Sequence, residues 1–124
     1  MFTFDTNSII YFLAGDQEIT SLFSEILSSN DPVVYIPTIV RLELLSKPQM
    51  SLYEQSVILE FLNYFRPIAL DENIADIAAD LRRIYKTKTA DSIVAATAIF
   101  TGSSLVTRNV KDFKNIEGLI IKNI

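Results

Sequence analysis

Short β-favouring segments alternate along this chain with segments whose apolar residues recur at helical spacing. The predicted strands are residues 2–4, 33–36, 67–70, 104–107 and 119–122. Strands that alternate with helices usually form a mostly parallel sheet, because each helix carries the chain back to the edge where the next strand begins. The sequence therefore predicts an α/β fold with a sheet of about five strands, covered by helices on both faces.

Capping residues and helix breakers delimit the helical segments. Helices are predicted after the polar run 5–8, after Gly15-Asp16 as far as Leu27, over residues 37–45 and 51–65, from a cap at Asp71 to beyond Ile84, and between Thr89 and Gly102. The last of these helices is apolar nearly all round over residues 93–100, which is typical of a helix buried inside a larger fold. A polar loop is predicted between the fourth and fifth strands.

Length and composition limit the chemistry that is open to the chain. A chain of 124 residues with 49% hydrophobic and 21% charged residues fits one domain over residues 1–124 and excludes intrinsic disorder. It contains no cysteine and no histidine, which excludes a disulfide scaffold, a thiolate nucleophile, a cysteine zinc site and an imidazole base. Any catalysis must therefore use carboxylates, hydroxyls, Lys, Arg, Tyr or a recruited metal ion.

Charge is distributed unevenly between the two halves of the chain. The net charge of −4 argues against a nucleic-acid partner, yet residues 63–124 hold nine basic and seven acidic residues, against two and eight in residues 1–62. Two basic clusters stand out in the second half, namely Arg82, Arg83, Lys86 and Lys88, then Arg108, Lys111 and Lys114. They are either solvated helix faces or places where a nucleic-acid backbone binds.

The sequence gives no sign of export or membrane insertion. No apolar stretch approaches the roughly 18 residues that cross a bilayer, and the first residues lack the basic region of a signal peptide. We therefore expect a cytoplasmic protein.

Four acidic residues occupy positions that suit a site. In open α/β sheets, sites form at the carboxyl ends of the strands. Asp5 follows the first strand, Asp91 lies just inside the apolar helix, and Asp112 lies in the loop after the fourth strand. Glu43 has apolar neighbours on its helix, so we expect its carboxylate to be partly buried unless another group pairs with it.

Each of these acids also has a purely structural interpretation. Asp5 and Asp91 suit helix N-termini, Asp112 suits a turn, and Glu43 has Arg41 nearby as an ion-pair partner. Converging carboxylates without bases would repel one another and raise each other's pKa, a cost that a divalent cation removes. Oxygen ligands without histidine or cysteine favour Mg²⁺ or Mn²⁺ over zinc.

Four blocks of sequence together resemble the PIN-domain ribonucleases, and more narrowly the VapC-type toxins of toxin–antitoxin pairs. The blocks are Phe4-Asp5-Thr6-Asn7, Arg41-Leu42-Glu43-Leu44, residues 88–98 around Asp91, and residues 106–113, which run Val-Thr-Arg-Asn-Val-Lys-Asp-Phe. They span nearly the whole chain in the order and spacing of that family.

This resemblance implies a PIN-like three-layer α/β/α domain that cleaves RNA with Mg²⁺, or with Mn²⁺ in its place. It assigns the catalytic and metal-binding roles to Asp5, Glu43 and Asp91, with Asp112 as the fourth acid rather than Asn109. The supporting polar residues are Thr6, Asn7, Thr107 and Asn109, and the candidates for binding the RNA backbone are Arg82, Arg83, Lys88, Arg108 and Lys111. The implied partners are an antitoxin protein and a second copy of the chain.

Of three other functions weighed against the sequence, one fits poorly and two remain open. Phosphoryl transfer of the haloacid-dehalogenase type needs a second aspartate two positions after the first, where this chain has Asn7. An RNA-processing nuclease of the same family would lack an antitoxin. A non-catalytic module would bind RNA or a partner and keep the acids as structural residues.

Overall fold

All five strands are parallel and form one sheet in the computed structural model, which describes residues 1–30 and 32–124. The strands are β1 (Phe2–Phe4), β2 (Val34–Pro37), β3 (Arg66–Ile68), β4 (Ser104–Thr107) and β5 (Ile120–Asn123), in the order β3-β2-β1-β4-β5. The first strand of the chain is thus the central one, with Phe2 opposite Val34 on one side and opposite Ser104 on the other. The predicted α/β fold with a mostly parallel sheet is confirmed.

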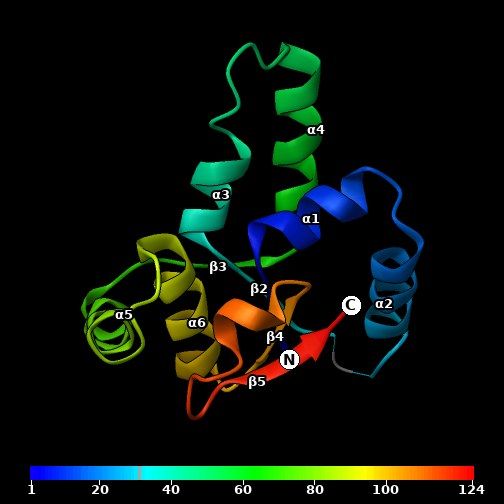
Figure 1. The fold of residues 1–124 in the computed structure, drawn as a ribbon. Helices are drawn as coiled ribbons and strands as arrows, with labels where there is room; N and C mark the ends of the chain where they lie inside the picture. The colour runs from blue at the N-terminus through cyan, green and yellow to red at the C-terminus, as the bar shows by residue number, and fades with distance from the viewer. Residues whose placement is uncertain (31) are drawn as a thin grey trace.

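Helices flank the sheet on both sides (Figure 1). They are α1 (Thr6–Leu13), α2 (Gln17–Leu27), α3 (Thr38–Leu44), α4 (Leu52–Leu62), α5 (Glu72–Tyr85), α6 (Thr89–Thr101) and the short α7 (Val110–Phe113). In Figure 1, α2 lies on one side of the strands and the pair α5 and α6 lies on the other, which gives the predicted three layers. No helix within the described residues is long and apolar enough to cross a membrane.

The core follows from the hydrophobic pattern of these elements. Helix α6 is buried on every side from Ser92 to Ala98, as its apolar sequence predicts. On the other face, five phenylalanine rings pack together with centroid distances between 4.4 and 6.0 Å. They are Phe4, Phe12, Phe23, Phe61 and Phe65, and they join β1, α1, α2 and α4.

Helices α3 and α4 form a hairpin that stands away from the sheet at the top of Figure 1. Phe61 anchors the end of α4 in the aromatic cluster, whereas Leu52 and Tyr53 at its start are 85% and 77% exposed. The hairpin thereby leaves one side of α3 open to solvent.

The structure differs most from the sequence-based expectation in three places, while the bounds of other elements shift by one or two residues. The loop predicted after β4 contains the helical turn α7, whose Phe113 is buried in the core. Strand β3 is residues 66–68 instead of 67–70, and α4 ends at Leu62, three residues before the predicted Phe65. Short edge strands and helix ends carry weak periodic signals, so their bounds are the features that pattern reading defines least well.

Candidate active site

Asp5 lies at the carboxyl end of the central strand, and both of its carboxylate oxygens are held. The backbone N–H of Ser8 donates to Oδ1 at 2.9 Å, so Asp5 caps α1, as its structural interpretation predicted. The hydroxyl of Thr107, at the end of β4, donates to Oδ2 at 2.6 Å. Two adjacent parallel strands therefore fix this half-buried carboxylate in one orientation.

Glu43 reaches the same region from α3. Its Oε1 accepts a hydrogen bond from the hydroxyl of Thr6 at 2.7 Å. Glu43 is exposed, because the α3–α4 hairpin stands out from the sheet, and its carboxylate is paired with Thr6, the alternative to burial that the sequence left open. Within the described residues, Glu43 forms no ion pair with Arg41.

Asp91 lies in the first turn of α6, and its pKa is raised above the ordinary aspartate value. Burial is the main cause, and the charge of Asp112 is the next. Asp5 and Glu43 raise the pKa further, while Lys88 opposes them. Asp91 lines one cavity together with Asp5 and Glu43, and a neighbouring cleft together with Asp112.

Asp112 and Asn109 come from α7 and the residue before it. The side-chain amide of Asn109 donates to Asp112 Oδ2 at 2.5 Å, and the backbone N–H of Asn109 donates to the Thr107 hydroxyl at 2.9 Å. Thr107 therefore connects Asn109 to Asp5. The polar residues predicted as supporting groups thus form hydrogen bonds to the acids, apart from Asn7, for which no such bond is found among the described residues.

A small polar cavity collects most of these side chains, and we call it the acidic pocket. It is lined by Asp5, Thr6, Asn7, Glu43, Asp91, Val94 and Asn109. Asp112 lines a neighbouring cleft that also contains Asp91. The structure thus brings three predicted acids to one pocket and the fourth to its border.

The donor set fits a hard divalent cation. Carboxylate and amide oxygens from four elements converge without histidine or cysteine, which suits Mg²⁺ or Mn²⁺. In the described part of the chain, no three acidic side chains are close enough to form a ready metal cage. The hydroxyls of Thr6 and Thr107 each donate to a different one of these carboxylates, Glu43 and Asp5 respectively.

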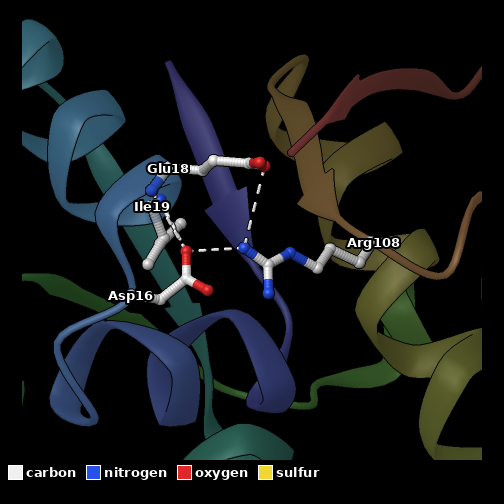
Figure 2. A network of polar contacts seen from close by, with 4 residues as sticks. All are labelled: Asp16, Glu18, Ile19 and Arg108. Carbon is white, nitrogen blue, oxygen red and sulfur yellow. Dashed lines mark hydrogen bonds and ion pairs between the residues drawn. The ribbon is translucent and has the colours of Figure 1, made fainter.

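The predicted backbone-binding residues lie in three different settings. Arg108 donates to Asp16 Oδ1 at 2.5 Å and lies 3.8 Å from Glu18 (Figure 2). It also covers the ring of Tyr11 at 4.4 Å from the centroid. Hydrogen bonding to each other raises the pKa of Arg108 and lowers the pKa of Asp16. Arg108 is therefore already paired on its own protein.

The other basic candidates lie on α5 and beside Asp91. Arg83 pairs with Asp80 at 2.7 Å, and the Nε of Arg82 donates to the carbonyl of Thr87 at 3.3 Å. Lys88 and Lys111 line the cleft that contains Asp91 and Asp112. These two lysines are the candidates that lie next to the acids.

Sequence reasoning did not select three residues that hold the site together. Ser8 donates its backbone N–H to the capping carboxylate of Asp5, which its position three residues after Asp5 signals. Its hydroxyl also donates to the carbonyl of Val106 at 3.0 Å. Tyr11 and Asp16 contact Arg108 across more than 90 residues of sequence. No local pattern predicts a contact of that range.

Comparison with known proteins agrees with this geometry. The family model of the PIN domain matches residues 2–119. The chain belongs to the PIN domain family. That match covers every acidic residue of the site and all strands but β5.

The relatives of this PIN domain protein include toxin–antitoxin components. It is 37% identical over 76 residues to Ribonuclease VapC1 of Rickettsia felis, a segment that covers 53% of this chain and 56% of that relative. It thus spans little more than half the length of this curated relative.

A toxin–antitoxin complex from Klebsiella pneumoniae matches over 100% of both chains with 29% identity and a TM-score of 0.83. VapBC2 from Rickettsia felis, bound to a promoter DNA fragment, matches over 99% of this chain and 98% of its own with 26% identity and a TM-score of 0.86.

Proposed function

We propose that this PIN domain protein is a metal-dependent endoribonuclease and the toxin of a toxin–antitoxin pair, acting in the cytoplasm. The observation that supports the proposal most is the convergence of Asp5, Glu43, Asp91 and Asp112, from four separate elements, on one edge of the sheet. A repelling acidic cluster of this kind makes physical sense if a cation occupies it. The relative named a ribonuclease supports RNA as the substrate.

In this proposal, Asp5, Glu43, Asp91 and Asp112 hold one or two Mg²⁺ or Mn²⁺ ions. The metal would supply activation of water and stabilisation of the negative charge that develops on the phosphodiester. Thr107 and Ser8 keep the Asp5 carboxylate turned toward the pocket, and Thr6 does the same for Glu43. No side chain has to act as a general base, which suits a chain without histidine.

The basic residues would hold the RNA backbone around this centre. Lys88 and Lys111 lie beside the acids and are proposed to bind phosphate. Arg108 is paired with Asp16 and is proposed to act by shaping the edge of the pocket. RNA binding by Arg82 and Arg83, which lie on α5, stays a prediction.

The test is cleavage of total RNA by the wild type and by Asp5→Asn, with the cut sites mapped. The wild type should cut in Mg²⁺ or Mn²⁺ and stop in EDTA, and Asp5→Asn should not cut. A domain that binds Mg²⁺ in calorimetry but leaves RNA intact would instead be a binding module.

The toxin assignment rests on the solved relatives. One of them is a toxin–antitoxin complex, and another is VapBC2. Co-expression with the protein encoded by the adjacent gene should yield a stable complex that no longer cuts RNA. Cleavage that no neighbouring gene product inhibits would favour an RNA-processing nuclease. A homodimer also stays a prediction, which light scattering of the purified protein tests.

A further inference from the structure

A cleft next to the acidic pocket concentrates positive charge, and we call it the lysine cleft. It lies between the loop that joins α5 to α6 and the segment around α7. Its polar lining includes Lys86, Thr87, Lys88, Lys111 and Asn115, and at one end it reaches Asp91 and Asp112. Within the described residues, none of the three lysines forms an ion pair. Their charges are therefore available to an anion from outside.

Both walls of the lysine cleft are fixed by contacts with the rest of the protein. Lys86 adopts a left-handed conformation with φ of 59°, which ends α5 and turns the chain toward α6. The Nε of Arg82 donates to the carbonyl of Thr87, and this bond braces the loop from α5. The hydroxyl of Tyr85 accepts a hydrogen bond from the backbone N–H of Glu117 at 3.1 Å, which ties this wall to the chain that follows α7. The lysines thus project from a preorganised frame.

Three hollows follow one another across this edge of the sheet. The lysine cleft and the acidic pocket share Asp91. The acidic pocket in turn shares Asp5, Asn7 and Asn109 with a third hollow, lined also by Tyr11 and Arg108. A single strand of nucleic acid that presents a phosphodiester to the acids would therefore occupy the hollows on both sides.

The two outer hollows differ in the charge that they offer. Arg108 is neutralised by Asp16 and lies near Glu18 (Figure 2), so the described residues that line the hollow on its side include no unpaired cation. The lysine cleft carries three lysines against Asp91 and Asp112, which the metal would neutralise. The lysine side of the acidic pocket is thus the side suited to a backbone phosphate.

We propose that the lysine cleft binds a backbone phosphate of the RNA on one side of the scissile bond, with Lys86 and Lys111 as its main ligands. This inference rests on the proposed ribonuclease function. It adds a second anchoring phosphate, a new ligand residue in Lys86, and an asymmetric path for the strand.

The experiment measures binding of a short RNA by Lys86→Gln/Lys111→Gln, in an Asp5→Asn background that does not cut. Lys88 stays unchanged, because its charge lowers the pKa of Asp91 and its loss would alter the acidic site. Lys122→Gln is the control for the loss of a lysine charge outside the cleft, since it removes one charge from an exposed lysine on β5. The RNA series carries a single neutral methylphosphonate, moved along the strand one position at a time.

We expect the protein with intact lysines to lose affinity when the methylphosphonate replaces one phosphate on one side of the cut. In the double variant, a methylphosphonate at that position should no longer reduce RNA affinity, while its effect at every other position should stay the same. The slope of log affinity against log salt should become shallower by about 0.7 for each phosphate that the double variant no longer binds. Lys122→Gln should keep both the profile and the slope.

Identical methylphosphonate profiles with and without the two lysines would overturn the inference. So would a double variant that binds RNA normally but loses a protein partner, because the cleft would then be a protein-binding surface. Cleavage by the otherwise wild-type protein, measured in parallel, separates the two proposals. If the protein does not cleave RNA but shows the expected methylphosphonate profile in binding, the ribonuclease function is rejected and the phosphate site in the lysine cleft is retained.

Discussion

The carboxylate of Asp91 would help to bind the proposed metal ion. Without the metal, the same charge lowers the stability of the folded protein. Burial and the charges of Asp112, Asp5 and Glu43 raise its pKa in the folded protein. The native state then holds its proton to higher pH than the unfolded chain does, for which the ordinary value is about 3.9. Stability without metal therefore falls as the pH rises from that value through the raised pKa of Asp91.

Asp91→Asn should abolish cleavage and raise the melting temperature of the metal-free protein at pH 7. The amide has nearly the same shape as the carboxylate but carries no charge, so the repulsion disappears. Thermal unfolding in EDTA tests this, and the difference between variant and wild type should vanish below about pH 3.9, where the wild-type carboxyl is protonated in both states. A strongly destabilised variant at pH 7 would show that Asp91 has a structural role.

Thr107 provides a test of how precisely Asp5 must be held. Thr107→Val keeps the shape of this fully buried side chain but removes the donor to Asp5 Oδ2 and the acceptor for the N–H of Asn109. Residues that orient metal ligands typically affect metal affinity or activity by about 10- to 100-fold, and we expect a loss of that size. Mg²⁺ titration and cleavage rates measure it. Thr107→Ser retains the hydroxyl and should stay close to the wild type.

The identity of the fourth acid is decided by comparing Asp112→Asn with Asn109→Ala. The charge of Asp112 acts directly on Asp91, whereas Asn109 contributes an amide that is bonded to Asp112. We therefore expect Asp112→Asn to reduce the cleavage rate far more than Asn109→Ala. The reverse order would identify Asn109 as the ligand and Asp112 as its support.

At the level of elements, the start of α2 is tied to the end of β4 through Asp16 and Arg108 (Figure 2). Asp16 also caps α2 by accepting from the backbone N–H groups of Glu18 and Ile19. The hydrogen bond from Arg108 lowers the pKa of Asp16, so the ion pair stabilises the fold above the ordinary aspartate pKa, and this stabilisation disappears as the pH falls through the lowered value.

Asp16→Asn separates the ion pair from the cap, because asparagine caps helices about as well as aspartate. The variant should melt at a lower temperature than the wild type at pH 7, and the gap should close at acidic pH as the wild-type Asp16 becomes protonated. Thermal unfolding at several pH values measures it. A gap that is independent of pH would mean that the charge of Asp16 contributes nothing.

Most elements were predictable because their signals are local. Helix α6 follows from its apolar sequence, and β1 from Phe2–Phe4 followed by the cap at Asp5. Helix α7 escaped prediction because it is a single turn in a polar segment, held by the burial of Phe113. The order of the strands in the sheet depends on contacts between distant segments, and periodicity does not encode those contacts.

For the candidate site too, the sequence predicted the features with local signals and missed those that depend on contacts between distant segments. Asp5 and Asp91 are marked by strand ends and helix starts, which local sequence reveals. Local sequence does not reveal the exposure of Glu43, because this exposure depends on how the α3–α4 hairpin leaves the sheet. The pairing of Arg108 with Asp16 spans 92 residues and carries no local signature.

For the whole molecule, the chemistry of the cut ends tests the proposed mechanism. Cleavage through the 2′-hydroxyl of RNA requires a base and an acid, a task usually given to histidine, which this chain lacks. Metal-assisted hydrolysis does not use the 2′-hydroxyl. The resemblance to the PIN-domain ribonucleases further implies products with a 5′-phosphate and a 3′-hydroxyl. End-labelling of the fragments measures this. Fragments with a 2′,3′-cyclic phosphate would contradict the acidic-site mechanism.

The central position of β1 has a consequence for when the acidic pocket is assembled during synthesis of the chain. Strand β4 lies beside β1 and orients the carboxylate of Asp5, but its residues come about 100 positions after Asp5 in the sequence. At about 5 to 20 residues per second, several seconds of translation separate the two. A growing chain therefore has no assembled acidic pocket until β4 and α7 have emerged, so a partner made in the same cell has that interval in which to be ready.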